Sequence, residues 1–315
     1  MLWWLSFLVF VLLMLVLDLG IFNRHAHVIK IKEALLWSAV WVLLALLFTV
    51  GIYFGWIGGF APEQRYPLAL QFITAYFIEK SLSIDNIFVF ALIFKYFSTK
   101  PEHQHKVLFW GIVGAFIMRA IFIFAGVALI NTFHWLLYIF GGVLVISGIK
   151  MITHSNEEIH PESNPLISLM HKLIPTAKEY HGEQFFVRKN AKLYATPLFA
   201  VVVVIEWSDL VFAVDSIPAV LAISTNTFIV YTSNVFAILG LRALYFALGG
   251  MLKAFEHLHY GLSAVLIFIG IKMLCMDVYK IPTGTSLSVV AICVLSSILA
   301  SIFTQRRGAA SCGRT

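Results

Sequence analysis

The segment LYATPLFAVVVVIEWSDLVFAVDSIPAVLAI, residues 193–223, decides the fold of this chain. It is apolar over about 31 residues, yet it contains three acidic residues, Glu206, Asp209 and Asp215, and no basic residue. A helix of that length measures roughly 46 Å, well beyond the roughly 30 Å hydrocarbon core of a bilayer. We therefore predict a membrane-spanning helix that is tilted, projects from the bilayer or is broken.

The composition of the whole chain agrees with a lipid environment. Of the 315 residues, 60% are hydrophobic and only 12% are charged, and the mean hydropathy is +0.90. Soluble domains carry roughly 25% charged residues, so an ordinary water-soluble domain is excluded and a single membrane domain is predicted. Cys275, Cys293 and Cys312 form no CxxC pair, which argues against a disulfide scaffold or a zinc ribbon. The apolar N-terminus lacks a preceding basic region and is predicted to be a retained span.

Nine segments have the length and apolar character of membrane spans. The predicted fold is therefore an all-α polytopic bundle of about nine spans, at 2–22, 34–57, 67–97, 106–131, 133–152, 193–223, 228–250, 259–277 and 282–304. We divide the single membrane domain, 1–315, into two leading spans (1–66), a first repeat (67–152), a cytoplasmic loop (153–192), a second repeat (193–277) and a last span with a basic tail (278–315).

Basic residues give the orientation of these spans. Sixteen Lys and Arg residues fall on one side of the predicted membrane, and only Arg65, Lys272 and Lys280 fall on the other. Because basic loops stay in the cytoplasm, the N-terminus is predicted outside and the C-terminus in the cytoplasm, in an inner (plasma) membrane. The loop 153–192 carries several His and Glu residues, which fit either a metal-sensing loop that regulates transport or a solvated linker of mixed charge.

Two parts of the chain resemble each other. SIDNI (83–87), MRAIF (118–122) and LVISGIKM (144–151) recur in the same order as AVDSI (213–217), LRALY (241–245) and LIFIGIKM (266–273). Each unit contains three spans, an odd number, so the second unit should enter the membrane from the opposite side. Inverted three-helix repeats of this kind are typical of transporters that bind their substrate at the midplane between the halves. A duplication without transport is the alternative.

Acidic residues outnumber basic ones inside the predicted spans. Six carboxylates face only three basic residues, Lys80, Arg119 and Arg242. An ion-pair network of purely structural function should be closer to neutral, so the surplus predicts a bound cation or exchangeable protons. We predict a metal site made of Glu79, Asp85, Asn86, Glu206, Asp209 and Asp215, with Asp18, Ser216, Arg119, Arg242 and Asn234 in supporting positions.

Helix geometry limits how these carboxylates can meet. Glu79 and Asp85 are six residues apart, as are Asp209 and Asp215, and residues at that spacing point about 120° apart on a straight helix. We therefore predict that the long helices are broken between the members of each pair, and Pro218 supplies one such break. Carboxylate, amide, hydroxyl and freed carbonyl oxygens suit a hard cation such as manganese(II), calcium or magnesium. Arg119, Arg242, Asn234 and Asp18 also fit structural roles as ion-pair or hydrogen-bond partners.

Five of these motifs together resemble the TerC family of integral membrane proteins, in particular its Alx branch. They are LDLGIF (17–22), EKSLSIDNIFVF (79–90), EWSDLVFAVDSIPAV (206–220), TSNVFAILGLRALYF (232–246) and FIGIKML (268–274), joined by FFVRKNAKLYATPL (185–198). The resemblance implies a fold like that of the LysE-type exporter superfamily, an association with manganese export, and ion handling by Glu79, Asp85, Asn86, Glu206, Asp209 and Asp215. The family takes its name from tellurite resistance.

These observations favour a secondary exporter of a divalent cation, with manganese(II) as the preferred ion and protons as a candidate counter-ion. No GxxxxGK[ST] motif is present, so the energy must come from a gradient. No permanently bound cofactor and no nucleic-acid partner is expected, and a homo-oligomer remains open. The alternative is a membrane-embedded assembly or envelope-stress factor of the tellurite-resistance type, without transport. An enzyme is not expected, because no HExxH motif or nucleophile–base pair is present.

Overall fold

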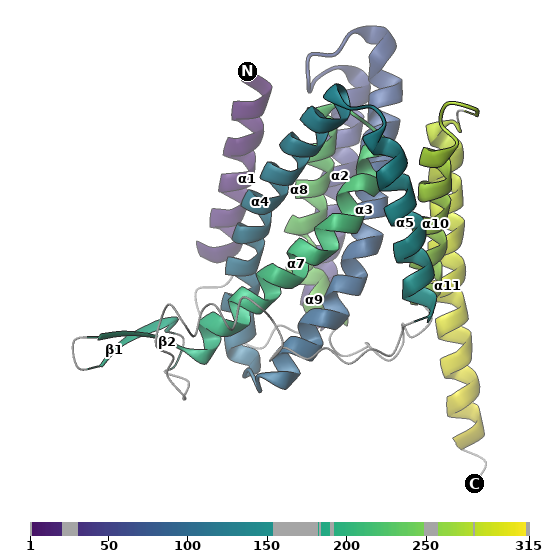
Figure 1. Cartoon of the computed structure of the whole chain (residues 1–315). Coiled ribbons are helices and arrows are strands. Elements are labelled where there is room, and N and C mark those ends of the chain that lie inside the picture. The colour runs from purple at the N-terminus through teal and green to yellow at the C-terminus, as the bar shows by residue number, and fades with distance from the viewer. Residues whose placement is uncertain are drawn as a thin grey trace.

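Helices account for nearly all of the described chain in this computed structural model (Figure 1). The structure describes residues 2–20, 31–153, 182, 184–189, 192–248, 258–279 and 281–312. The elements are α1 (Leu2–Gly20), α2 (Ile31–Phe54), α3 (Pro62–Tyr96), α4 (Pro101–Thr132), α5 (Leu136–Thr153), β1 (Phe186–Lys189), β2 (Lys192–Ala195), α7 (Pro197–Leu221), α8 (Thr227–Leu239), α9 (Leu241–Leu248), α10 (Leu258–Leu274) and α11 (Thr283–Cys312).

Three long helices begin at a proline. Pro62, Pro101 and Pro197 open α3, α4 and α7 respectively. Proline is favoured in the first helical turn because its fixed backbone angle matches the helix and its missing N–H would have had no partner there. Glu63 and Glu102 follow in the first turns of α3 and α4, where an acidic side chain interacts well with the helix dipole. These local signals set the starts of the helices that carry the site.

The number of membrane spans is only partly settled. Among the described residues, six helical stretches are long and apolar enough to cross a membrane: Lys32–Phe54, Pro101–Thr132, Leu136–Thr153, Pro197–Leu221, Thr227–Ala247 and Thr283–Ser301. Two shorter apolar helices, Leu2–Val16 and His259–Leu274, accompany them. The helix α3 is absent from this set, because polar and charged side chains interrupt its apolar run. Each predicted span coincides with a helix, but the count of nine spans is not confirmed.

The prediction that the two long helices break is wrong. The helix α3 runs without interruption for 35 residues and α7 for 25 residues. Pro218 lies inside α7 but only in its last turn, where the N–H of Ala222 still donates to the Pro218 carbonyl at 2.9 Å. Pro218 has no N–H to donate to the Val214 carbonyl, but the hydrogen bond that its own carbonyl accepts still forms, and the helix continues to Leu221. Asp209 and Asp215 therefore remain on one continuous helix.

A break occurs instead in the segment predicted as 228–250. There, α8 ends at Leu239, Gly240 separates the helices, and α9 begins at Leu241. A Cβ on Gly240 would lie 2.6 Å from the Lys80 Nζ, so only glycine leaves room for that ammonium group. Lys80 donates to the Ala237 carbonyl at 3.3 Å, which places a cation at the C-terminal end of α8.

Helix packing surrounds α3, which contacts α2, α7, α8, α9, α10 and α11. The helix α4 packs on α7, α8 packs on α3, and α5 packs on α10 (Figure 1). These last three contacts, α4 with α7, α8 with α3 and α5 with α10, stay the same when α3 is exchanged with α7, α4 with α8 and α5 with α10. An inverted repeat requires this symmetry. The repeat itself stays a prediction. The approach of α5 to α10 is close, because a Cβ on Gly270 would lie 2.7 Å from the Gly141 carbonyl oxygen.

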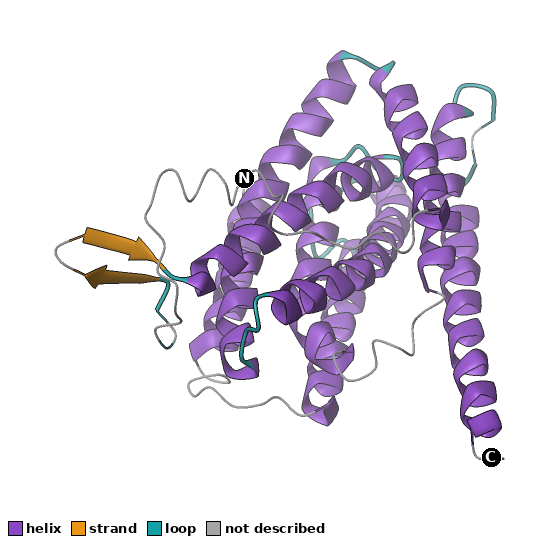
Figure 2. Cartoon of the chain, turned by 60° about the horizontal axis from the view of Figure 1, so that its bottom comes forward, coloured by secondary structure: helices purple, strands orange, loops and turns teal. Residues whose placement is uncertain are grey.

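The fold is mostly helical, as predicted, but one element of the described chain is a pair of strands. Strands β1 and β2 form an antiparallel hairpin just before α7, and the hairpin projects sideways from one end of the bundle (Figure 2). The predicted span at 193–223 therefore starts at Pro197 instead, because the preceding residues are in β2 and the proline begins the helix. Residues 154–181 lie outside the described part of the chain, so both interpretations of the predicted loop 153–192 remain predictions.

Candidate functional site

A buried polar cluster surrounds Arg119, in the middle of α4. Arg119 is only 2% exposed. Its Nη2 donates to Oδ1 of Asp209 at 3.0 Å and its Nε donates to Oδ2 of the same carboxylate at 3.2 Å. This two-pronged geometry is the strongest arrangement for an Arg–carboxylate pair, and it fixes α7 against α4. Gly111 and Gly126 of α4 face α7 as well, which lets the two helices approach.

Glu79 supplies a second carboxylate to the same guanidinium from α3. Arg119 Nη1 donates to Glu79 Oε1 in a buried ion pair. Glu79 is 1% exposed, and its other oxygen, Oε2, has no hydrogen-bond partner among the described residues. A buried carboxylate oxygen that lacks a donor is costly, so this atom is available to a ligand that carries positive charge.

Neutral polar side chains complete the cluster and connect four helices. They lie on α3, α7 and α8, and they place amide and hydroxyl oxygens around the ion pairs. Arg119 Nη1 donates to Asn234 Oδ1 at 3.1 Å and to Ser216 Oγ at 3.4 Å, and Asn86 Nδ2 donates to Asp209 Oδ1 at 3.4 Å. The structure thus brings together six residues that the sequence singled out: Glu79, Asn86, Arg119, Asp209, Ser216 and Asn234.

Two buried carboxylates share one guanidinium in this cluster. Glu79 and Asp209 both contact Arg119, so these three groups alone would carry one negative charge with both carboxylates ionised. The buried Arg242 adds a positive charge beside Asp209, and the ammonium group of Lys80 points to the carbonyl of Ala237 at the end of α8. Carboxylates in a membrane interior are expensive, so the shared pair marks a candidate site for a cation or a proton.

Glu206 lies one turn before Asp209, on the side of α7 that faces α4. It is half-buried and accepts no hydrogen bond from any described residue. A Cβ on Gly114 would overlap the Glu206 carboxylate, so the absence of a side chain at that position makes room for it. The functional importance of Gly114 could not be inferred from the sequence, where nothing distinguishes it from the other glycines.

Asp215 faces a different neighbour. Ser147 of α5 donates to its Oδ1 at 2.7 Å, so Asp215 lies in the interface between α5 and α7 and not in the Arg119 cluster. The divergence from Asp209 follows the rotation of about 120° expected for a straight helix. Ser147 was not among the predicted site residues, although it belongs to the repeated LVISGIKM motif.

Three further predicted residues stand apart from these contacts. The side chains of Asp85 and Asp18 lie outside the described residues, so their predicted roles are not tested. Arg242 is buried, 5% exposed, and lines a cavity of about 10 Å³ together with Asp209. That volume is about the space of a single water molecule. Arg242 therefore lies beside the cluster, next to the carboxylate that Arg119 binds.

A larger cavity opens beyond the C-terminal end of α7. It has a volume of about 400 Å³ and lies between the end of α7 with the loop that follows it, the end of α10, and the starts of α3 and α5. We call it the outer vestibule, because the predicted orientation places it outside the cell. Its polar lining residues are Gln71, His134, Ser224, Thr225, Asn226 and Lys272. Lys272 donates to Ser286 Oγ at 3.0 Å, which holds its positive charge in the wall.

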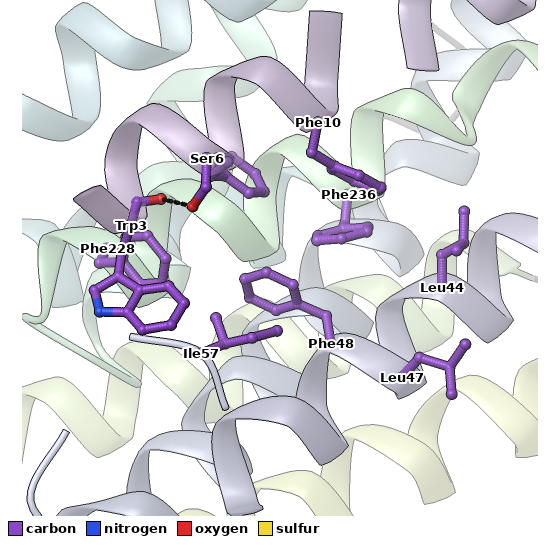
Figure 3. A pocket seen from close by; sticks show the side chains of 10 residues that line it. Trp3, Ser6, Phe10, Leu44, Leu47, Phe48, Ile57, Phe228 and Phe236 are labelled. Atoms are coloured by element: carbon purple, nitrogen blue, oxygen red, sulfur yellow. Dashed lines mark hydrogen bonds between the residues drawn. The ribbon is translucent and has the colours of Figure 1, made fainter. Parts of the chain in front are cut away.

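An apolar cavity between α1, α2 and α8 does not suit a cation. Its volume is about 320 Å³, and aromatic and aliphatic side chains line it (Figure 3). The hydroxyl of Ser6 is bonded to the carbonyl of Trp3 at 3.1 Å in its own helix, so it is not directed at a ligand. This cavity supplies no charged oxygen, and the polar cluster therefore remains the candidate site.

The structure does not gather the five described members of the predicted metal site at one point. Within the described residues, no group of three or more His, Cys, Asp or Glu side chains could hold a metal ion. Glu79 and Asp209 meet at Arg119, Asn86 donates to Asp209, Glu206 lies a turn away, and Asp215 contacts α5. The metal site stays a prediction.

Comparison with known proteins places the chain among membrane proteins. Residues 65–309 match the family described as "Integral membrane protein TerC family". The chain is 50% identical over 308 residues to an uncharacterized membrane protein of Myxococcus xanthus, covering 98% of this chain and 94% of the relative. It is 47% identical over 288 residues to the "Putative membrane-bound redox modulator Alx" of Salmonella typhi (91% and 89% covered), and 46% identical to that of Escherichia coli K12 (91% and 90%). No solved structure matches.

Proposed function

The chain belongs to the TerC family of integral membrane proteins, and from this membership we propose that it is a secondary exporter of a divalent metal cation, with manganese(II) as the preferred ion. The transported ion is a substrate that binds and leaves, not a resident cofactor. Transport would proceed by alternating access, in which the two halves of the bundle expose a buried site first to the cytoplasm and then to the outside.

The observation that carries this proposal is that two carboxylates share the guanidinium of Arg119 while one carboxylate oxygen, Glu79 Oε2, has no hydrogen-bond partner among the described residues. Glu79 and Asp209 are nearly fully buried, and a single guanidinium serves both. A purely structural network would be expected to pair its buried polar atoms in the membrane interior. The carboxylate, amide and hydroxyl oxygens present here are those preferred by hard divalent cations, and no described cluster of Cys or His competes.

The position of the cluster supports a path through the protein. Ser216 contacts Arg119, and Leu221, on the same helix, lines the outer vestibule. Five residues of helix separate them, or roughly 7.5 Å along the axis. On the other side, Glu206 lies about one turn from Asp209 toward the start of α7. A cation could therefore pass from Glu206 to Asp209 and leave through the vestibule with short steps.

The energy for export would come from a gradient. Protons are the candidate counter-ion, because a carboxylate that loses a metal ion can bind a proton in its place. The membrane potential, or the metal gradient itself, is the alternative driving force.

The proposal is tested by manganese(II) flux into inverted membrane vesicles or proteoliposomes. We expect flux with the wild type, and a loss of at least about tenfold in Glu79→Gln and Asp209→Asn at matched folded amounts, since each removes a buried ligand charge. Glu63→Gln is the matched control, because Glu63 is exposed in the first turn of the same helix as Glu79. If the folded wild type moves no divalent ion under any gradient, the exporter assignment fails.

A second function is favoured by the internal bonding of the cluster. Arg119 ties α3, α4, α7 and α8 together, as it would in a membrane-embedded assembly or envelope-stress factor that transports nothing. In that case Glu79→Gln and Asp209→Asn would lower stability and no ion would move. The relatives described as putative membrane-bound redox modulators point to a redox role, and among the described residues the cysteines are Cys275 and Cys293, both free thiols.

A further inference from the structure

The hairpin of β1 and β2 carries an exposed face that the transport proposal does not use. Its register pairs Phe186 with Ala195 and Arg188 with Leu193, so these residues share one face. Phe186 is 39% exposed, Leu193 is 54% exposed, and Arg188 is exposed too, whereas Val187 on the opposite face is buried. The exposed face thus combines two large apolar side chains with a fixed positive charge.

The hairpin is fixed to the beginning of a membrane-spanning helix. Thr196, directly after β2, donates its N–H to the Phe185 carbonyl at 2.9 Å and its hydroxyl to the Gln184 carbonyl at 2.7 Å. The helix α7 starts at the next residue, Pro197. A four-residue strand extends about 13 Å, so no part of the hairpin can lie far from the end of α7 and from the bilayer surface.

The exposed face lies on the side of the hairpin that contacts α7. The ring of Phe186 packs against that of Phe199, with 4.6 Å between their centroids. Phe199 is the third residue of α7, so this contact joins the exposed face to the first turn of the helix. In both views the hairpin extends sideways from the bundle instead of continuing along the helices (Figures 1 and 2). It therefore lies across the direction of the helices, near the start of α7.

The charge of the segment identifies the lipid that would bind. Residues 185–195 contain three basic residues and no acidic one. The register pairs Lys189 with Lys192 across the two strands. Anionic headgroups attract basic segments at the membrane surface, and aromatic and aliphatic side chains flanked by basic ones are typical of interfacial segments.

We propose that the β1–β2 hairpin lies on the leaflet next to the start of α7, which is cytoplasmic in the predicted orientation, and binds anionic phospholipid there. Phe186 and Leu193 enter the boundary between headgroups and acyl chains, and Arg188 contacts the phosphates. This contact involves neither the Arg119 cluster nor a transported ion. The lipid-binding proposal is therefore independent of the exporter proposal.

The test measures what surrounds Leu193. A spin label is attached to Leu193→Cys in full-length protein in which Cys275, Cys293 and Cys312 are replaced, and the protein is placed in nanodiscs of phosphatidylcholine alone or with phosphatidylglycerol. Collisions with oxygen, which is enriched in lipid, are compared with collisions with a water-soluble nickel complex. A label at Glu102→Cys is the control, because Glu102 is exposed at the start of α4, at the same end of the bundle.

We expect the label at 193 to report lipid contact in phosphatidylglycerol nanodiscs and the label at 102 to report water in both. Each basic residue strengthens attachment to an anionic surface about fivefold, so Arg188→Gln should weaken the lipid-bound state by that factor, and adding Lys189→Gln and Lys192→Gln should abolish it. A label at 193 that stays in water, or that reports lipid equally in both mixtures, overturns the proposal. Shielding from both reagents overturns it in favour of a protein partner.

Discussion

The most informative residue is Arg119, because two buried carboxylates from different helices share its guanidinium. Its guanidinium holds carboxylates from two helices and two neutral side chains, all within a protein interior where unpaired charge is costly. Removing one partner of a buried ion pair lowers the stability of the protein far more than lacking the pair altogether. Two predictions concern the side chains that meet at α4.

Replacing Arg119 with Gln should destabilise the protein by about 3–5 kcal/mol, because Glu79 and Asp209 then lose their shared counter-charge. Arg119→Lys should recover only part of that loss, since an ammonium group cannot make the two-pronged contact. Thermal unfolding of the purified protein, followed by tryptophan fluorescence, measures both variants. An Arg119→Gln protein as stable as the wild type would contradict the structural role.

Gly114→Ala should impair transport without harming the fold. Alanine favours a helix by about 1 kcal/mol over glycine, and the added Cβ strikes only the flexible end of Glu206. The carboxylate must move, and we expect manganese(II) flux to fall about tenfold, as a loss of about 1.4 kcal/mol would give. Gly142→Ala is the control, because a Cβ there meets nothing within 4 Å. Equal flux in the two variants would show that Glu206 does not contribute to the transport path.

At the scale of elements, the apolar pattern of the sequence located the helices well but not their breaks. A break was expected at Pro218, a strong local signal, yet the helix continues past it to Leu221. The observed break at Gly240 adjoins Lys80, which is distant in the sequence and donates to the Ala237 carbonyl at the end of α8. The pairs formed by side chains could not be predicted from the sequence either, because they also join residues that are far apart in the chain. That Asp209 meets Arg119 while Asp215 meets Ser147 depends on how α4 and α5 surround α7.

The contact between α5 and α10 gives a prediction about helix packing. A Cβ on Gly270 would lie 2.7 Å from the Gly141 carbonyl oxygen and 2.9 Å from the Val145 backbone nitrogen. Both are backbone atoms, which cannot rotate away as the end of a side chain can. Gly270→Leu should therefore separate the helices and cost at least about 3 kcal/mol. The yield of monodisperse protein in size-exclusion chromatography reports this loss. Gly142→Leu, on the open side of α5, should fold normally, and similar yields for both variants would argue against the close contact.

At the scale of the whole molecule, the distribution of basic residues predicts which side of the membrane each end of the bundle faces. Single cysteines at Glu102 and at His134 lie at opposite ends of α4 in the structure. In a background without the native cysteines, a membrane-impermeant maleimide should label position 134 in intact cells and position 102 only in inside-out vesicles. The reverse pattern would invert the predicted orientation and turn the outer vestibule toward the cytoplasm.

The fixed guanidinium also limits the stoichiometry of exchange. A site of two bare carboxylates would need two protons to become neutral after a metal ion leaves, whereas Arg119 already supplies one of those two positive charges. If the guanidinium stays in place, the emptied cluster can bind no more than one proton before it is neutral. A proton-to-metal ratio above one would then have to include carboxylates outside the cluster, such as Glu206 or Asp215. In the proposed transport cycle, Arg119 acts as a counter-ion that cannot diffuse away, and it limits the cluster itself to one exchanged proton for each metal ion.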